Sequence, residues 1–212
     1  MALFLTIAFF SAGCVPSMAT KPDNNPMLKV VHSEDAESAS RRTKDMADWV
    51  VSSRDNRNKP FAIVDKVNAK VHAFGADGKP YGDAPVLLGL AKGDHSVPGI
   101  GNKTYAQITP EERTTPAGRF EAIMGMNHKG KEILWLDYEQ ALSMHAVIKG
   151  IPRDRRAQRL ASPSPLDNRI SYGCINVPVT YFKDVIQGNF SGNGGIVYIL
   201  PETGQFKPTP KT

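Results

Sequence analysis

One cysteine and one histidine in this sequence have surroundings that suit nucleophilic chemistry. Cys174 follows a glycine in the stretch 170–178 and has apolar neighbours, and His145 lies upstream in a short apolar run typical of a strand. A nearby imidazole that accepts the thiol proton makes a cysteine a strong nucleophile, and folding can bring together two such residues that are distant in sequence. The alternative interpretation is that both are structural, since most cysteines act as small buried apolar residues.

The start of the chain predicts export. Residues 1–19 contain an uncharged apolar run, which is too short to span a bilayer as a mature helix but suits a secretory signal. We expect either cleavage after Ala19, giving a protein of the periplasm or cell envelope, or lipidation at Cys14, giving a membrane-anchored lipoprotein. The alternative is an ordinary N-terminal strand. In either exported form Cys174 is the only free thiol, a liability in an oxidising compartment unless it is buried or used.

Composition and charge exclude several classes of protein. The 212 residues are 41% hydrophobic and 22% charged, which is ordinary for a globular domain and excludes disorder throughout. The formal net charge is +5, but no cluster of Lys and Arg with interleaved aromatic residues occurs. We therefore expect a basic face suited to a polyanionic surface and no nucleic-acid partner.

Hydrophobic periodicity predicts a mainly β fold with a few helices, of the α+β class. Residues 20–58 are predicted to form a tether followed by an amphipathic helix at roughly 38–53. Residues 202–212 are predicted to form a polar tail. Between them, residues 59–201 form one domain with a tight turn at Asp77-Gly78 and a helix from Pro178 to Gly188. Its expected strands cover 61–67, 69–74, 84–90, 119–126, 133–138, 143–148 and 195–200.

Three further histidines do not form a metal-binding pattern. We expect His72 and His128 to face solvent from a strand and a turn, and His95 to lie in a loop. None has a metal-ligand spacing to a cysteine or to another histidine, so the sequence predicts no metal and no cofactor.

A long segment between the two candidate catalytic residues stands out. Residues 150–168 contain three prolines and several arginines and show no periodicity, which predicts an irregular loop. A loop of this length is either functional, as a lid or docking segment, or an inert insertion. Its ends must lie near the site if His145 and Cys174 meet.

Two motifs resemble the L,D-transpeptidase family with its YkuD-type catalytic domain. The first is His145 followed by Ser171-Tyr172-Gly173-Cys174-Ile175-Asn176, and the second is Thr115-Pro116-Ala117-Gly118-Arg119-Phe120. The resemblance covers about 60–201 and implies a single β-sandwich or barrel-like catalytic domain with a short N-terminal helix. Two departures are that Tyr172 replaces the family's histidine and that the loop before Ser171 looks longer than usual.

The resemblance implies a function and roles for the site residues. Cys174 would form a thioester with the diaminopimelate carbonyl of a peptidoglycan tetrapeptide stem, releasing D-alanine, and then pass the acyl group to an amine. His145 would move the protons, and the main-chain carbonyl of Ala146 would orient its ring. A helix N-terminus after the cysteine would add to thiolate stability.

The roles of the neighbouring residues follow in the same way. Backbone N–H groups of Tyr172, Gly173 and Cys174 would hold the oxyanion. Ser171 and Asn176 would brace this loop or contact substrate. The acceptor is another stem peptide or an envelope protein. Two alternatives remain: an L,D-carboxypeptidase that uses water as acceptor, and a non-catalytic cell-wall-binding module.

Overall fold

The computed structural model describes residues 41–202 and Phe206. The predicted signal in 1–19, with Cys14, and the first part of the predicted tether lie outside the described residues. The elements, in chain order, are α1 (Arg41–Ser53), β1 (Phe61–Asp65), β2 (Lys70–Phe74), β3 (Pro80–Pro85), β4 (Leu88–Gly89), η2 (Ile100–Asn102), η3 (Pro110–Glu112), β5 (Gly118–Met126), β6 (Glu132–Asp137), β7 (Leu142–Ala146), η4 (Pro152–Asp154), α2 (Arg156–Leu160), β8 (Arg169–Ser171), β9 (Ile175–Val177), α3 (Val179–Tyr181), η5 (Phe182–Gln187), α4 (Gly188–Phe190) and β10 (Gly195–Leu200).

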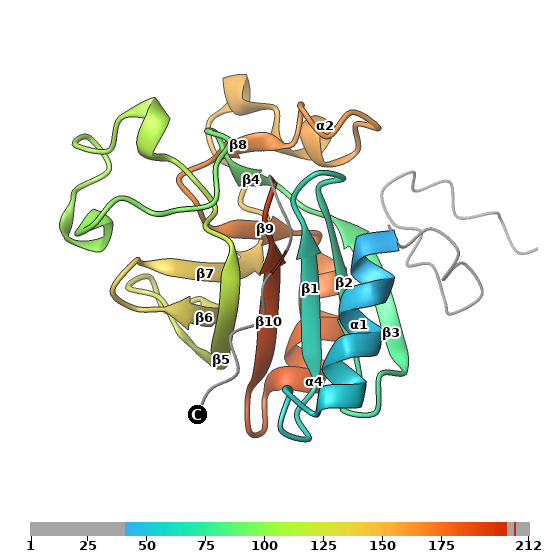
Figure 1. Ribbon diagram of the computed structural model, residues 1–212. Helices are drawn as coiled ribbons and strands as arrows, with labels where there is room; N and C mark the ends of the chain where they lie inside the picture. Colours follow the sequence, from blue (N-terminus) through green and yellow to red (C-terminus); the bar gives the residue numbers. More distant parts are fainter. Residues whose placement is uncertain (1–40, 203–205, 207–212) are drawn as a thin grey trace, which may run out of the picture.

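One large sheet organises the described chain and is almost closed on itself. Eight strands follow the order β3-β2-β1-β10-β5-β6-β7-β9, and β4 and β8 form a separate pair. Leu87, just after β3, bridges Asn176 in β9 through two backbone hydrogen bonds of 2.8 and 2.9 Å. These bonds link the two ends of the sheet into a barrel-like wall (Figure 1). The prediction of a mainly β, barrel-like domain with a short N-terminal helix is confirmed.

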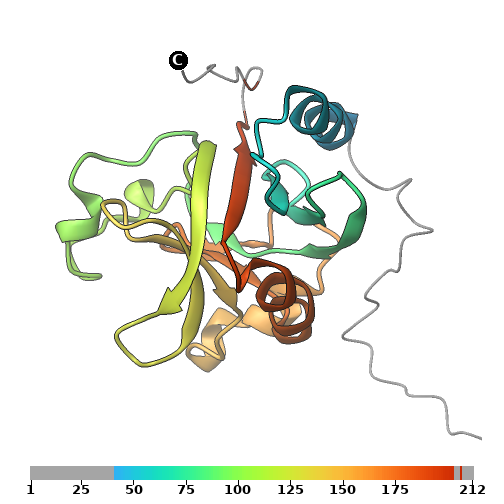
Figure 2. The same cartoon turned by 90° about the horizontal axis from the view of Figure 1, so that it is seen from below.

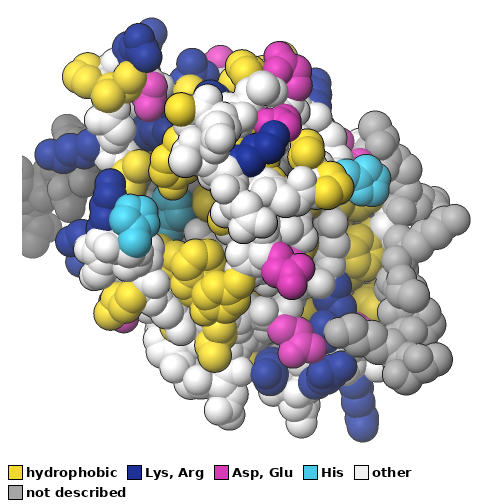
Figure 3. All heavy atoms as spheres, turned by 90° about the vertical axis from the view of Figure 1, so that its left-hand side faces the viewer, with side chains coloured by type: hydrophobic (Ala, Val, Ile, Leu, Met, Phe, Trp, Pro, Cys, Tyr) yellow, Lys and Arg dark blue, Asp and Glu magenta, His cyan; other side chains and the backbone are white. Residues whose placement is uncertain are grey.

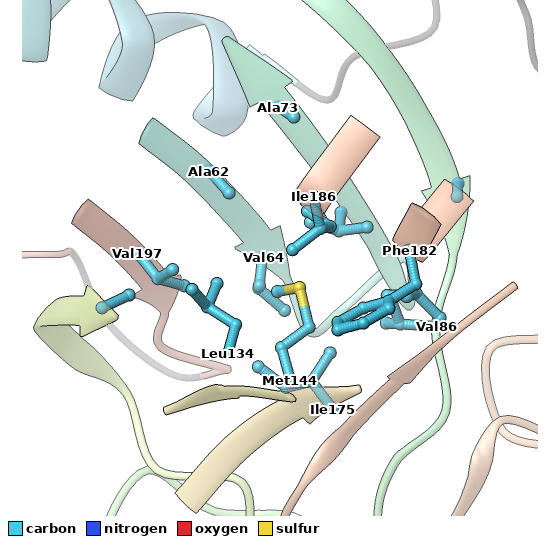
Figure 4. Close-up of a cluster of buried hydrophobic side chains, with 14 of the residues drawn as sticks. Ala62, Val64, Ala73, Val86, Leu134, Met144, Ile175, Phe182, Ile186 and Val197 are labelled. Carbon is cyan, nitrogen blue, oxygen red and sulfur yellow. The ribbon is translucent and has the colours of Figure 1, made fainter. Parts of the chain in front are cut away.

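The core fills the inside of this wall. Inward-facing residues of the strands pack against the helical segment α3–η5–α4, and Figure 4 shows Met144 and Ile175 pointing into this cluster near Phe182 and Val86. Each apolar side chain buried here contributes roughly 1.5–3 kcal/mol relative to exposure. Because side chains alternate along a strand, the neighbours of Met144 and Ile175 must point to the outer face.

The helix α1 covers part of the outer face of the wall. Its buried residues Met46, Ala47 and Val50 lie on one stripe and pack against the outward side chains of β1 and β10, including Phe61 and Tyr198. Figure 2 shows α1 on one side of β1 and β10 and the segment 179–190 on the other. The amphipathic stripe in the sequence is therefore the buried face of this helix.

Several sequence-based boundaries differ from the structure. The expected strand 84–90 is divided, because the chain leaves β3 at Pro85 and pairs again in β4 with β8. Pro178 precedes the helical segment as its N-cap, and the helix continues past Gly188 to Phe190. Residues 150–168 are not irregular throughout, since they contain η4 and the five-residue helix α2.

His72 was expected to face solvent, and that prediction is wrong. The residue is only 6% exposed. It lies opposite Ile63 in the β1–β2 pair, and Ile63 belongs to the outer face of the wall, which packs against α1. Burial lowers the pKa of His72, and the nearby Asp83 carboxylate opposes this effect in part. His128 is exposed on the β5–β6 turn and His95 lies in a loop, as expected.

Within 41–202, no helix is long and apolar enough to cross a membrane. No group of three or more His, Cys, Asp or Glu side chains in this part of the chain is arranged to hold a metal ion.

Candidate active site

The pairing of β7 with β9 brings the histidine and the cysteine together. The two strands run parallel, with His145 opposite Asn176 and Met144 opposite Ile175. Met144 and Ile175 are buried in the core, so Ser143 and His145 on β7 share the outer face with Cys174 and Asn176. Cys174 is placed one residue before β9 begins. The fold thus assembles these four side chains from two separate segments.

Cys174 is a free thiol at the surface of this arrangement. It is half-buried and makes no disulfide within the described chain. The hydroxyl of Ser143 donates to its Sγ over 3.5 Å, and in the thiol form its Sγ donates to the carbonyl oxygen of Ala141 over 3.4 Å. These neighbours hold the sulfur atom in place while part of the side chain faces solvent.

His145 and Cys174 change each other's protonation. Burial alone would raise the pKa of the Cys174 thiol, but the hydrogen bond and the charge of His145 lower the pKa below its ordinary value. Burial works against the charged imidazole, yet the hydrogen bond and the charge of Cys174 raise the pKa of His145 above its ordinary value. Both shifts favour a thiolate–imidazolium pair, the reactive state of a nucleophilic cysteine.

The ring of His145 has a fixed orientation. Its Nδ1 lies 2.8 Å from the main-chain oxygen of Ala146. A carbonyl oxygen only accepts, so Nδ1 carries a proton in every form of the ring that keeps this bond. The proton exchanged during chemistry is then the one on Nε2.

The loop that carries Cys174 is held by hydroxyl groups on both sides. Ser171 Oγ donates to the carbonyl oxygen of Cys174 over 2.7 Å and accepts from the N–H of Gly173 over 3.1 Å. Thr115 Oγ1 donates to the carbonyl oxygen of Gly173 over 2.7 Å and accepts from the N–H of Gly89 over 2.8 Å. Thr115 belongs to the second motif, so the two motifs are in direct contact.

Only glycine suits position 173. Gly173 has a φ of 129°, which side chains rarely adopt, and a Cβ placed there would lie 2.8 Å from the carbonyl oxygen of Thr114. The close approach of these two backbone segments therefore depends on the absence of a side chain.

The structure differs from two expectations, one about the groups that would hold the oxyanion and one about the group that stabilises the thiolate. The N–H of Gly173 is already used by Ser171, which leaves the N–H groups of Tyr172 and Cys174 without a hydrogen-bond acceptor in the described chain. No helix begins at the cysteine either, because β9 separates Cys174 from α3. The expected contribution of a helix N-terminus to the thiolate is therefore wrong, and His145 supplies the effect.

A buried ionic network behind Thr115 was not apparent in the sequence. Lys66 is 1% exposed, and its Nζ donates to the carbonyl oxygens of Gly93 and Thr115 over 2.6 and 2.9 Å and to Asp94 Oδ1 over 2.7 Å. Lysine is almost never fully buried without partners, and nothing in the sequence around position 66 indicates burial. This network holds the main-chain carbonyl of Thr115, the residue whose hydroxyl contacts the loop that carries Cys174.

Tyr172 is held against two neighbours beside the cysteine. The guanidinium carbon of Arg113 lies 4.0 Å above the centre of its ring, and the Tyr105 ring meets it edge-on at 4.9 Å between centroids. These contacts orient the residue that stands where the resembled family has histidine. They also bring the segment between β4 and β5 to the edge of the site.

The outer face that carries the site continues across β6 and β5. Trp135 is opposite Ser143 on one side and Ile123 on the other, and the Trp135 and Tyr138 rings stack at 4.6 Å between centroids. Ile123 and Tyr138 are 54% and 67% exposed. Figure 3, which views the molecule from this side, shows hydrophobic side chains gathered in a patch with Lys and Arg side chains near its edge.

Comparisons with known proteins give distant similarities in structure. No protein-family model and no curated protein matches the sequence. The chain is similar to the catalytic domain of an L,D-transpeptidase from E. faecium, with 18% identity and a TM-score of 0.39, over 68% of this chain and 98% of that one. It is also similar to the helical cell shape determining protein Pgp2 from Campylobacter jejuni, with 15% identity and a TM-score of 0.45, over 75% of this chain and 56% of that one.

A third similar structure is a fused Zn-dependent amidase/peptidase/peptidoglycan-binding domain-containing protein from Clostridium acetobutylicum ATCC 824. The identity is 16% and the TM-score 0.44, over 85% of this chain and 65% of that one. The chain thus spans less than two thirds of the second and third of these proteins. Identities this low leave the functional argument to the residues of the site.

Proposed function

We propose that this protein is an exported cysteine acyltransferase that acts on peptidoglycan as an L,D-transpeptidase. The observation that carries the proposal is the arrangement of Cys174 and His145, in which a half-buried thiol lies beside an imidazole whose Nδ1 is held by the carbonyl of Ala146. A cell-wall substrate implies a location in the periplasm or cell envelope.

In the first half-reaction, the thiolate of Cys174 attacks the carbonyl carbon of the diaminopimelate residue in a tetrapeptide stem. A C–S bond forms, and the carbonyl oxygen becomes an oxyanion. The C–N bond to the terminal D-alanine then breaks while Nε2 of His145 gives its proton to the leaving amine. The products are a thioester and free D-alanine, and His145 is left neutral.

In the second half-reaction, an amine attacks the thioester. Nε2 of His145 accepts a proton from this amine, the C–S bond breaks, and Cys174 leaves as a thiolate beside the imidazolium. The acceptor amine belongs to another stem peptide or to an envelope protein.

The oxyanion is held by the N–H groups of Tyr172 and Cys174. Both are free of other hydrogen bonds in the described chain and lie in the loop that carries the nucleophile. Loss of one such donor typically costs about 3–4 kcal/mol of transition-state stabilisation. Ser171 and Thr115 keep the loop in the required shape through the contacts described above.

The test is mass analysis of the products formed from a purified tetrapeptide stem, with and without an acceptor amine. Release of D-alanine together with a transfer product supports the proposal. The variants Cys174→Ala and His145→Ala should abolish release, whereas His128→Ala, which changes an exposed histidine on a turn, should not.

Two other outcomes identify the alternatives. Release of D-alanine with tripeptide as the only product, even at high acceptor concentration, identifies a carboxypeptidase. Binding of cell-wall fragments with no release by the wild-type protein identifies a non-catalytic module.

A further inference from the structure

The side chain of Asn176 lies between the catalytic pair and the segment 150–168. The residue is 1% exposed. Its Nδ2 donates to the carbonyl oxygen of Cys174 over 3.2 Å and lies 3.5 Å from Nε2 of His145. Its Oδ1 accepts a hydrogen bond of 3.1 Å from Nη1 of Arg156. One buried amide therefore joins α2 to both catalytic residues.

The partners of Asn176 determine which way its amide points. A guanidinium only donates, so the atom that faces Arg156 must be the oxygen. A carbonyl only accepts, so the atom that faces Cys174 O must be the nitrogen. Arg156 thus holds the amide in the orientation that directs an N–H group toward Nε2 of His145.

An N–H donor that faces Nε2 favours one protonation state of His145. The contact is favourable when Nε2 carries a lone pair and unfavourable when Nε2 carries a proton. Ala146 O requires the proton on Nδ1. Together the two contacts select the neutral ring with its proton on Nδ1, the form that accepts a proton at Nε2.

The side chain of Arg156 is largely buried and is held by partners. Its side chain is 11% exposed, and its Nε pairs with Asp154 Oδ2 at 3.2 Å. The charged or titratable groups that act on His145 are Cys174, which raises its pKa, and Arg156, which lowers it. Asp154 is the carboxylate that pairs with Arg156, and the other side chain near Nε2 is the neutral amide of Asn176.

We propose that Arg156 is a positioning residue that holds Asn176 and thereby keeps His145 neutral in the second half of the reaction. In the resting enzyme the thiolate opposes this influence and supports an imidazolium. Once the sulfur is bound in a thioester, its charge is gone while Arg156 and Asn176 remain. His145 is then held ready to accept the proton of the incoming amine. The inference rests on the proposed function for the nature of the step, and on the contacts for the effect on His145.

The first experiment requires no substrate. In the Cys174→Ala protein, which lacks the thiolate as the thioester form does, the pKa of His145 is measured by NMR titration. Arg156→Gln should raise this pKa, because a positive charge and the bond that orients Asn176 are both lost. Arg155→Gln is the matched control, since Arg155 is an exposed neighbour with no bond to Asn176, and it should leave the pKa unchanged. An unchanged value in Arg156→Gln, or an equal shift in Arg155→Gln, overturns the proposal.

A second comparison tests the route through Asn176. Asn176→Ala should also raise the pKa of His145, and the double variant with Arg156→Gln should shift it by less than the sum of the single shifts. Additive shifts would exclude Asn176 as the link. If Arg156→Gln does not fold, as judged by circular dichroism, Arg156→Lys should give a smaller shift of the same sign, because it keeps the charge without the planar donor pair.

The third experiment measures acyl transfer from the tetrapeptide stem to an amine. Below neutral pH, Arg156→Gln should slow transfer roughly threefold or more, since less of the general base is neutral, and the difference should vanish at alkaline pH. A constant factor at all pH values would contradict the proposal. If the wild-type protein releases no D-alanine, the proposed function fails while the NMR titration still decides the role of Arg156.

Discussion

Thr115 donates a hydrogen bond of 2.7 Å to the carbonyl oxygen of Gly173, the residue that precedes the candidate nucleophile. The same hydroxyl accepts from the N–H of Gly89, and the carbonyl of Thr115 accepts from the buried Lys66. One residue thus connects the buried Lys66 and β4 with the loop that carries Cys174. Loss of the Thr115 hydroxyl should therefore lower both the stability of the fold and the reactivity of Cys174.

Thr115→Val should lower the free energy of unfolding by about 1–3 kcal/mol, because the buried N–H of Gly89 and carbonyl of Gly173 lose their partner. Acylation of Cys174 by a carbapenem, which inhibits the resembled family, should slow at a temperature where the variant is fully folded. Denaturant unfolding and mass analysis of the adduct measure the two effects. Thr115→Ser keeps the hydroxyl and should restore acylation; if it does not, the hydrogen bond is not the cause.

Gly173→Ala should disable the site while Cys174 and His145 remain. A methyl group at this position meets Thr114 O at 2.8 Å and requires a φ of 129°, a conformation that costs of order 1–3 kcal/mol. Carbapenem adduct formation should fall sharply. Gly130→Ala is the matched control, since Gly130 also has a positive φ of 66° but has nothing within 4 Å of the added carbon. Equal losses in the two variants would show that only general destabilisation is at work.

The thiol of Cys174 should react with iodoacetamide at a lower pH than an ordinary cysteine. His145 lowers the pKa of Cys174 against the effect of burial, so thiolate persists as the pH falls. His145→Ala removes this effect. The midpoint, which is the pH at which the alkylation rate reaches half of its maximum, should therefore rise. His128→Ala should leave the midpoint in place. A midpoint that is the same in wild type and His145→Ala would refute the pairing.

The N-terminus should be processed. The apolar run in 1–19 should direct export, followed by cleavage after Ala19 or by lipidation at Cys14. Mass analysis of protein recovered from the envelope distinguishes the two routes, because only lipidation adds a diacylglycerol group. Recovery of protein that begins at an intact Met1 would contradict both.

The candidate nucleophile and base were identifiable from the sequence because their chemistry depends on residue type. Cys174 is the only thiol after the predicted signal, and His145 lies in a run whose apolar pattern marks a strand. The sheet was also predictable, since β1, β6 and β10 are short runs rich in branched and aromatic residues. The contact of Ala146 O with the ring of His145 was expected from the resemblance alone.

Other features could not be read from the sequence, for physical reasons. The helix α2 has five residues, too few for a periodic pattern, so the bond from Arg156 to Asn176 had no local signal. His72 has the polar character of an exposed strand position, but it shares a face of the sheet with Ile63, which packs against α1. This long-range packing leaves no local signal in the sequence. Lys66 is buried because Asp94 and two carbonyl groups from distant segments converge on its ammonium group.

Asn176 also carries the backbone bonds to Leu87 that link the two ends of the sheet. The amide that we propose directs His145 and the link that completes the wall therefore belong to one residue. Activation of the thiol is in this way conditional on folding. In an unfolded or newly made chain Cys174 has no imidazole beside it and behaves as an ordinary, weakly ionised cysteine. We expect enhanced reactivity only when β7, β9 and Leu87 have come together, so the reactivity of Cys174 would report that the barrel has formed.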